Sequence, residues 1–424
     1  MHDIKFIKNN PKLFDQRLKN RNLKPQSSEI ITLHKNYVEK LLLKENLQKQ
    51  RNTITTKIRD SSKIKLENID ELRNKVKIIK NDINELESLV TELKSKLDDI
   101  LFKLPNLLDS DVPIGLNEND NQVIKKIDKK INQNFKLLNH LQIAENLKQI
   151  HYNEAVKLSG AKFSILSSSL ASLARALKNF MLDYHKDNGY EEFLVPELVK
   201  DDALFGTGQL PKFKEDLFHT SNNLWLIPTS EVCLVNINRE KILNNEDLPL
   251  RYTTFTNCFR AEAGSAGQET KGLIREHQFG KVELVSITEP KKSNNELDRM
   301  MHLVESILIK LALSFKVVKL CSGDVGFSSA KTFDFEIWLP GQKKYMEISS
   351  CSNCREFQSR RMKMRIKNEK DKSIIFPHTL NGSGLAIGRS IVAILESYQQ
   401  EDGSVIIPEA LQKYMGGQNK ILKK

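Results

Sequence analysis

The sequence predicts an α+β protein in which helices flank an antiparallel sheet and an antiparallel α-helical coiled-coil arm precedes it. A heptad pattern of apolar residues occupies much of the first hundred residues, and many strand-length segments follow residue 220. The chain contains no Gly-x-Gly-x-x-Gly or Walker sequence, either of which would favour a parallel nucleotide-binding sheet. We therefore divide its 424 residues into an arm (1–105), a linker (106–160) and a sheet domain (161–424).

Two apolar stripes predict the arm. Between residues 69 and 100 the apolar side chains recur in alternating steps of three and four, as in a long amphipathic helix with a coiled-coil seam. A weaker stripe over residues 30–58 would be its partner, with a turn near residues 60–62 and Pro105 ending the second helix. The weaker stripe is interrupted by three basic residues, Lys40, Lys44 and Arg51.

Turn signals and alternation predict the elements that follow. The linker should contain short helical pieces and loops at residues 111–115 and 117–121. An apolar-faced helix should then run from about residue 170 to Asn188-Gly189. In residues 332–339, apolar and polar residues alternate, so one face of that strand should be buried. The other expected strands are Trp225–Ile227, Arg251–Glu262, His277–Ile287 and Tyr345–Ser349, and the flanking helices are Glu296–Phe315 and Leu385–Gln400.

The chain is basic, with a formal charge of +12 and a pI of about 9.2. Residues 1–100 hold 22 Lys and Arg against 15 Asp and Glu, so most of the excess lies in the arm. Such clustering favours an anionic macromolecular partner, although a Lys-rich composition contributes and a plain dimerisation coiled coil is an alternative. No signal peptide or membrane-length apolar run is visible, which predicts a cytoplasmic protein that does not bind membranes.

Five cysteines in a chain of this length indicate reduced thiols in a reducing compartment. Cys351-x-x-Cys354 has the spacing of half a structural zinc site. No second CxxC or HxxxH pair accompanies it, so ordinary thiols are the favoured interpretation.

Residues 255–283 read FTNCFRAEAGSAGQETKGLIREHQFGKVE, two strand-like arms around a Gly-rich loop. Alternation would place Arg275, His277, Phe279 and Lys281 on one face of the second arm. Guanidinium groups bind two phosphate oxygens at once and a phenyl ring offers a stacking surface, so the set suits a purine nucleotide triphosphate. We expect a structural role for His277.

Three segments together resemble class II aminoacyl-tRNA synthetases. The hairpin resembles their motif 2, Gly189–Glu197 is similar to motif 1, and Asn381–Arg389 is similar to motif 3. Within that class the chain resembles the bacterial seryl-tRNA synthetases most. The segments typical of that family are Gly206–Phe213, Thr229–Glu231 and Glu347–Asn353.

The resemblance implies ATP-dependent ligation of L-serine to tRNA(Ser) through a seryl-adenylate, with serylation of tRNA(Sec) where the organism has it. It implies a homodimer built through motif 1 and an arm that grips the long variable arm of the tRNA. Residues 161–424 would then be the class II catalytic domain. The candidate arm contacts are Arg17, Lys19, Arg21, Arg51, Lys57 and Arg59.

The resemblance also assigns the ATP site. Arg260 would hold the α-phosphate and the substrate carboxylate, with Arg275 and Arg389 on the outer phosphates; these three are the expected catalytic residues. Glu262 would accept a hydrogen bond from the adenine amino group, and Phe279 would stack beneath the ring. Glu347 and Ser350 would hold Mg²⁺. Neighbouring positions complete the expected ATP site: Ala261, Glu276, Ile348 and Ser349.

Serine recognition is expected from polar side chains, because a site that hydrogen-bonds a hydroxyl rejects analogues without it. The candidates are Thr229, Ser230, Glu231, Glu283 and Ser383. Which carboxylate takes the amino group and which the hydroxyl stays open. A non-catalytic tRNA-binding relative would have degraded motifs, whereas a relative that loads a carrier protein would lack the arm; an intact enzyme is favoured over both.

Overall fold

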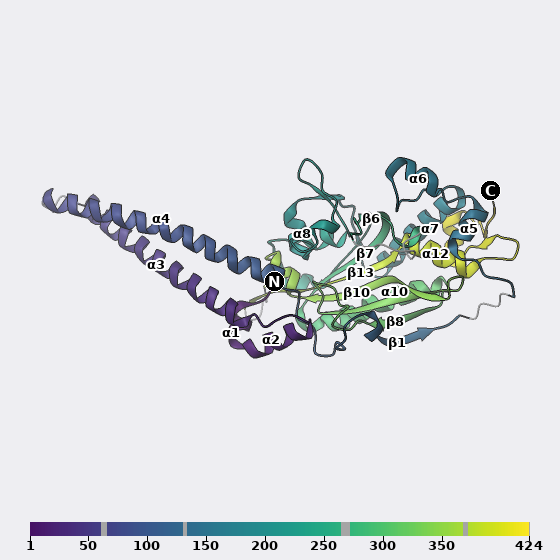
Figure 1. Ribbon diagram of the computed structural model, residues 1–424, viewed down its shortest axis with the longest axis horizontal. Coiled ribbons are helices and arrows are strands. Elements are labelled where there is room, and N and C mark those ends of the chain that lie inside the picture. The colour runs from purple at the N-terminus through teal and green to yellow at the C-terminus, as the bar shows by residue number, and fades with distance from the viewer. Residues whose placement is uncertain (61–65, 130–133, 264–271, 368–371, 424) are drawn as a thin grey trace. The chain divides into compact units, whose positions relative to one another are not determined.

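The computed structural model describes the chain except for residues 61–65, 130–133, 264–271, 368–371 and 424 (Figure 1). The chain forms two compact units, one of residues His2–Leu104 and one of residues Pro105–Lys424 together with Met1. Within the described residues, no helix is both long enough and apolar enough to cross a membrane.

The smaller unit is a helical arm. Two short helices, α1 (Ile4–Asn9) and α2 (Pro11–Asn20), precede the long helices α3 (Ser27–Arg59) and α4 (Leu66–Lys103), which run side by side (Figure 1). Lys44 on α3 pairs with Glu87 on α4 at 3.2 Å, and residues 28–36 face residues 96–100, so the two helices are antiparallel as predicted. The expected turn at residues 60–62 extends outside the described residues.

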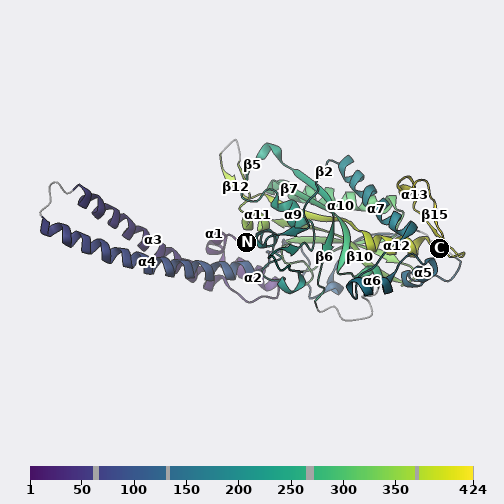
Figure 2. The ribbon, with the colours of Figure 1, turned by 90° about the horizontal axis from the view of Figure 1, so that it is seen from above.

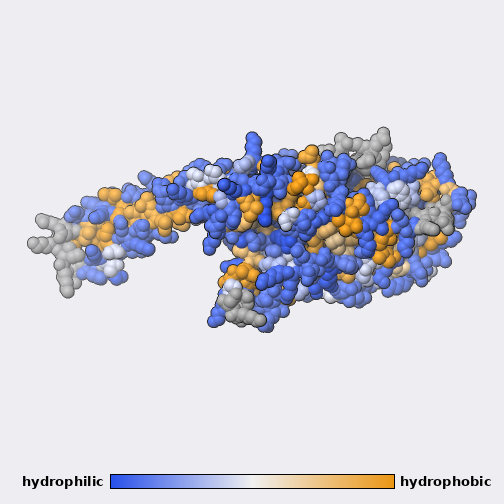
Figure 3. Space-filling view, turned by 90° about the horizontal axis from the view of Figure 1, so that it is seen from below, coloured by the Kyte–Doolittle hydropathy of each residue, from blue (hydrophilic) through white to orange (hydrophobic). Residues whose placement is uncertain are grey.

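The seam between the long helices follows the heptad prediction. All ten apolar positions from Ile69 to Ile100 are buried or half-buried. Three basic residues of α3, Lys40, Lys44 and Arg51, occupy positions of the apolar stripe and preserve its alternating steps of three and four residues. They are half-buried, like the apolar residues beside them. Apolar residues are also visible along the arm on the face shown in Figure 3.

The larger unit is built on an eight-stranded sheet with the strand order β1-β8-β9-β10-β13-β7-β6-β2. All neighbouring strands are antiparallel except β2 and β6, which confirms the predicted α+β class. The strands are β1 (Gln122–Ile127), β2 (Glu191–Glu192), β6 (Leu250–Phe259), β7 (Gln278–Thr288), β8 (Phe315–Lys319), β9 (Lys331–Leu339), β10 (Lys344–Arg355) and β13 (His378–Ala386).

Three helices cover one face of this sheet: α7 (Ser168–Asp187), α10 (Ser293–Lys310) and α12 (Ile387–Tyr398) (Figure 2). Their apolar residues form one core with side chains from β7, β9 and β13, among them Phe335, Ile337 and Leu339. The alternation in β9 therefore buries one face, as predicted, and sends Asp334, Glu336 and Trp338 to the opposite face.

The remaining elements are short. The short helices are α5 (His140–Leu147), α6 (Tyr152–Ser159), α8 (Asp201–Thr207), α9 (Glu231–Asn236), α11 (Phe357–Arg361) and α13 (Glu409–Gln412). Two small sheets have two strands each: β3 (Leu198–Val199) with β4 (Trp225–Leu226), and β14 (Val405–Ile406) with β15 (Lys420–Ile421). A third small sheet has three strands: β5 (Ile242–Asn244), β11 (Arg365–Lys367) and β12 (Ile374–Ile375).

Four strands of the main sheet, β1, β2, β8 and β13, are not among the strands that alternation and turn signals predicted. The edge strand β1 lies within the segment 106–160, and its side chains are nearly all exposed, so no buried alternation marks it. Strand β8 begins at Phe315, where the sequence predicted the end of a helix; α10 instead ends at Lys310. The expected strand near Trp225 pairs with β3 rather than with the main sheet.

Candidate active site

The predicted hairpin is present. Strands β6 and β7 pair from Leu250 opposite Ile287 to Phe259 opposite Gln278. Beyond that point the Arg260 amide still donates to the His277 carbonyl at 2.9 Å. The tip of the loop, residues 264–271, lies outside the described residues.

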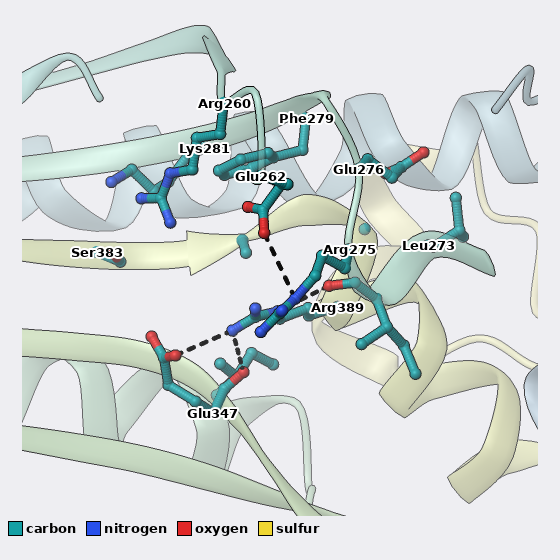
Figure 4. Close-up of a pocket in the computed structure, with 14 residues that line it drawn as sticks. Arg260, Glu262, Leu273, Arg275, Glu276, Phe279, Lys281, Glu347, Ser383 and Arg389 are labelled. Atoms are coloured by element: carbon teal, nitrogen blue, oxygen red, sulfur yellow. Dashed lines mark hydrogen bonds and ion pairs between the residues drawn. The ribbon is translucent and has the colours of Figure 1, made fainter. Parts of the chain in front are cut away.

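The two arms of this hairpin meet strand β10 and the first turn of helix α12 around one cavity, which encloses about 550 Å³ of space that is open to solvent. Arg260, Phe279 and Arg389, which are far apart in sequence, all line it (Figure 4). The other lining residues are Glu262, Leu273, Ile274, Arg275, Glu276, Lys281, Glu347, Ile348, Ser383, Ala386 and Gly388.

The side chains in this cavity form pairs of opposite charge. Arg389 Nη1 lies 3.2 Å from Glu347 Oε2 and donates to the Glu347 carbonyl at 2.8 Å. Partial desolvation acts to raise the pKa of Glu347, but Arg389 and Arg260 outweigh it and hold that pKa below its usual value. Arg275 Nε lies 3.6 Å from Glu262 Oε2. A guanidinium group can donate two parallel hydrogen bonds to a phosphate as it does to a carboxylate, so these arginines could leave their carboxylate partners and bind phosphate oxygens.

An aromatic surface lies beside these charges. The Arg260 guanidinium carbon lies 5.2 Å from the centre of the Phe279 ring, and both line the cavity. His277 does not line the cavity; its Nδ1 lies 2.9 Å from the Arg260 carbonyl oxygen, and its ring packs against Phe163 and Phe218. These contacts fit the structural role expected for His277.

A second, more open cavity of about 1260 Å³ adjoins the first and shares Arg260, Glu262 and Arg275 with it. Thr229 lines this second cavity. Its hydroxyl donates to Glu283 Oε2 at 3.1 Å and accepts from Lys281 Nζ at 2.9 Å. Lys281 also pairs with Glu283 at 2.5 Å, so the three side chains form one network at the floor of the site.

Glu231 lies deeper than predicted. Gln358 Nε2 donates to its Oε1 at 2.6 Å, and Asn381 Nδ2 donates to its Oε2 at 3.1 Å. Burial and the nearby Glu283 carboxylate raise the pKa of Glu231 to about 7, while Gln358 and Lys281 oppose the shift. Ser383 stands directly across the strands from Glu283.

Six expected site residues line neither cavity in the described part of the chain. Ser230 is fully buried, and its hydroxyl has no partner. The Ser349 hydroxyl donates to the Ser383 carbonyl at 2.6 Å, and the Ala261 amide donates to the Asp216 carbonyl at 2.9 Å. The whole set is Ser230, Glu231, Ala261, Glu283, Ser349 and Ser350. Ile348 does line the first cavity, although its side chain belongs to the apolar core.

A β-bulge decides the orientation of β10. Its pairing with β9 shifts between Glu347 and Ser349, so Glu347 stands opposite Glu336 and Ser350 stands opposite Asp334. Glu336 and Asp334 share the polar face of β9, and the bulge therefore brings Glu347 and Ser350 onto that same face. Strict alternation would have separated them.

Four further polar side chains contribute to the site and were given no individual role from the sequence: Lys281, Asp334, Gln358 and Asn381. The sequence placed Lys281 on the arginine-bearing face of the hairpin, which was a usable signal. Asp334 belongs to the polar half of an evident alternation. Nothing in the local sequence around Gln358 marks it, because its partner Glu231 is 127 residues away.

The Cys351-x-x-Cys354 pair does not converge. Cys351 lies in the apolar core, and Cys354 Sγ lies 3.8 Å from Asn381 Oδ1. The described residues contain no group of three or more His, Cys, Asp and Glu side chains that could hold a metal ion.

The antiparallel sheet, with arginines, a phenyl ring and carboxylates around one cavity, agrees with the class II aminoacyl-tRNA synthetase core that the sequence resembles. Residues 213–398 match the family model of the tRNA synthetase class II core domain (G, H, P, S and T). Residues 1–108 match that of the seryl-tRNA synthetase N-terminal domain.

The chain belongs to the seryl-tRNA synthetase family. It is 48% identical to the serine–tRNA ligase of Ehrlichia ruminantium over 436 residues, with all of both chains covered. The crystal structure of seryl-tRNA synthetase from Pyrococcus horikoshii complexed with ATP is similar with a TM-score of 0.91 at 35% identity, again over all of both chains. The cytoplasmic serine–tRNA ligase of Naegleria fowleri in complex with AMP gives a TM-score of 0.86 at 27% identity, covering 100% and 99% of the two chains.

Proposed function

We propose that this chain ligates L-serine to tRNA(Ser) at the expense of ATP, through a seryl-adenylate. One observation carries the proposal: Arg260, Phe279 and Arg389 all line a single cavity, which brings phosphate-binding groups and a stacking surface together. The serine carboxylate attacks the α-phosphorus, pyrophosphate leaves, and the seryl group then passes to a terminal ribose hydroxyl of the tRNA. Positioning and charge neutralisation suffice for both steps.

In this reaction the three arginines share the anionic groups. Arg260 lines both cavities, so it is suited to hold the α-phosphate and the serine carboxylate at the point where they meet. Arg275 and Arg389 take the outer phosphates, Glu262 accepts from the adenine amino group, and Phe279 stacks on the adenine ring. The cation–π contact between Arg260 and Phe279 keeps both side chains at the nucleotide.

Serine enters beside Thr229 at the floor of the second cavity. The network of Thr229, Lys281 and Glu283 offers donors and an acceptor to a small polar amino acid. Gln358 and Asn381 each donate to one oxygen of Glu231 and hold its carboxyl group in place, and each oxygen keeps a lone pair for a donor on the substrate. Ser383 stands across from Glu283 and completes the side-chain pocket.

Mg²⁺ fits the face formed by Glu347 and Ser350. The candidate ligand atoms there are all oxygens, which Mg²⁺ prefers, and within the described part of the chain the buried Asp334 Oδ1 opposite Ser350 has no hydrogen-bond partner. Glu347 and Ser350 would hold the ion, which when bound supplies positive charge to the ATP phosphates.

The helical arm is proposed to bind the long variable arm of tRNA(Ser). Lys19, Lys57 and Arg59 are exposed on it, as phosphate contacts must be. Arg21 fits that role less well, because burial lowers its pKa to about 10. The catalytic site would also serylate tRNA(Sec) in a cell that contains this tRNA. A charging assay with a tRNA(Sec) transcript would test this.

A homodimer is proposed to form at the β2 edge of the sheet, in the cytoplasm. Leu194, directly after β2, is 94% exposed, as is suitable for a contact with a second copy. Light scattering should report twice the 48.7 kDa mass of the chain at micromolar concentration. A strict monomer would refute the dimer.

Amino-acid-dependent exchange of pyrophosphate into ATP tests the central proposal. Measured with each of the twenty amino acids in turn, exchange should be supported by serine above all others. Exchange with threonine or proline but not with serine would overturn the substrate assignment and leave the fold assignment intact.

A further inference from the structure

Glu276 lies between Arg275 and His277 in the second arm of the hairpin, and its side chain is only 7% exposed. It lines the nucleotide cavity, yet in Figure 4 its carboxylate points away from Arg260, Glu262 and Glu347. The carboxylate is therefore placed behind the site rather than toward the reacting groups.

On one side this carboxylate binds the segment that leads into α7. The Ser164 hydroxyl donates to Glu276 Oε1. In the same stretch the His277 amide donates to the Lys162 carbonyl at 2.9 Å, and the rings of Phe163 and His277 lie 5.5 Å apart. Three consecutive residues are thus docked along the arm that carries Arg275.

On its other side the carboxylate touches the first turn of α12. A Cβ added to Gly388 would lie 3.2 Å from Glu276 Oε2 and 2.9 Å from the Leu273 carbonyl oxygen, so only glycine allows this close approach. The next residue is Arg389, whose Nε donates to the Ile274 carbonyl at 3.2 Å. The buried side chain of Glu276 therefore contacts both the segment packed against Arg275 and the helix turn that carries Arg389.

No cation in the described part of the chain pairs with this carboxylate. The buried hydroxyl of Tyr152 on α6 lies near it, and burial followed by the nearby Glu276 raises the pKa of Tyr152, while a hydrogen bond with the Leu273 backbone opposes the shift. Burial of a carboxyl group without a counter-ion lowers the free energy of unfolding. An apolar side chain would stabilise the fold more if packing were the only role of this position.

We propose that Glu276 is a positioning residue for ATP, which fixes the spacing of Arg275 and Arg389 by joining Ser164 to the first turn of α12. The inference deepens the proposed function, on which it rests for the identity of the nucleotide. Because Glu276 acts on the phosphate-binding arginines and not on the serine pocket, its loss should weaken ATP binding selectively.

The test measures the dissociation constant for ATP by titration calorimetry on the full-length protein, together with KM for ATP and for serine in the exchange reaction. Glu276→Ala should raise the dissociation constant and KM for ATP about tenfold and change KM for serine less than about twofold. Glu276→Gln, which keeps an acceptor for Ser164, should restore ATP affinity to within about threefold of the wild type.

Ser164→Ala provides a second route that keeps the carboxyl, and Ser167→Ala is its matched control on the same segment, since the Ser167 hydroxyl contacts His151 instead. Ser164→Ala should weaken ATP binding about threefold and Ser167→Ala should not. Equal ATP affinity in these two variants, or an equal rise in both KM values for Glu276→Ala, would overturn the inference. Absence of serine-dependent exchange in the wild type would instead refute the proposed function, while calorimetry would still report on Glu276.

Discussion

At the scale of single residues, the site is held together by pairs that ligand binding must rearrange. Arg389 reaches Glu347, and Arg275 reaches Glu262, each at a distance that a hydrogen bond to phosphate could replace. The side chain of Glu347 is still 49% exposed and that of Arg275 44% exposed, so these pairs contribute little to folding. Their residues are available for chemistry.

Arg389→Ala should therefore damage activity and spare stability. Removing one preorganised cation from a phosphoryl-transfer site costs roughly 10²–10³-fold, so serine-dependent pyrophosphate exchange should fall by at least about 100-fold. The unfolding temperature, followed by circular dichroism, should stay close to that of the wild type. Arg175→Ala on the exposed surface of α7 is the control, and exchange above one tenth of the wild-type rate in Arg389→Ala would contradict the assignment.

Glu276 also makes the stability of the protein depend on pH. Burial raises its pKa from 4.5 to about 7. Below pH 4.5 the carboxyl is protonated in both states, so this contribution to stability is fully present there and is lost as the pH rises through about 7.

Glu276→Gln should consequently unfold at a temperature roughly 3–6 °C above the wild type at pH 8, with a much smaller difference at pH 5. Differential scanning calorimetry at the two pH values measures this. The prediction fails if the difference between variant and wild type is the same at both.

At the scale of elements, the interface between α3 and α4 accommodates basic side chains within an apolar stripe. The α4 side carries apolar residues throughout, whereas α3 presents Lys40, Lys44 and Arg51 at seam positions. Lys44 is 16% exposed and pairs with Glu87, while the stems of such side chains can cover the apolar α4 stripe. The stability of the hairpin therefore depends mainly on the fully apolar layers.

Leu97→Ala truncates one of the buried apolar side chains in the interface between α3 and α4. Leu97 is 1% exposed, so the substitution should cost about 2–5 kcal/mol in the free energy of unfolding of the arm. Calorimetry should show a lower unfolding temperature, while serine-dependent exchange, which belongs to the other unit, should not change. Lys80→Ala on the exposed face of α4 should leave both unaltered, and unchanged unfolding of Leu97→Ala would show that the seam is assigned wrongly.

At the scale of the whole molecule, the chain is two units with separate cores. Among the described residues, those that line the two cavities all belong to the larger unit, from Gln209 to Arg389. The two chemical steps should therefore differ in what they need: adenylate formation needs the larger unit, and transfer needs a bound tRNA as well.

Deletion of residues 2–104 separates these requirements. Serine-dependent pyrophosphate exchange should persist, while kcat/KM for serylation of tRNA(Ser) should fall by at least about 100-fold, because the phosphate contacts proposed for the arm would supply much of the affinity. Filter assays with radiolabelled serine measure the second activity. Equal loss of both activities in a folded variant would refute the division between the units.

Features encoded by local periodicity could be predicted from the amino-acid sequence alone. The ten apolar positions from Ile69 to Ile100 repeat within one helix, and the β6–β7 hairpin joins neighbouring segments, so both could be read without knowing the rest of the fold. The convergence of Arg260, Phe279 and Arg389 was also expected, but only through resemblance to a family, since 129 residues separate the first from the last.

Only the tertiary structure decided which side chains share a surface across distant strands. The bulge that brings Glu347 and Ser350 together depends on the register with β9, and the edge strand β1 forms because β8 offers it a partner. The burial of Glu231 against Gln358, and of Glu276 against Ser164, likewise depends on contacts more than 100 residues apart. Such contacts leave no local pattern, because their free energy arises only after the sheet has assembled.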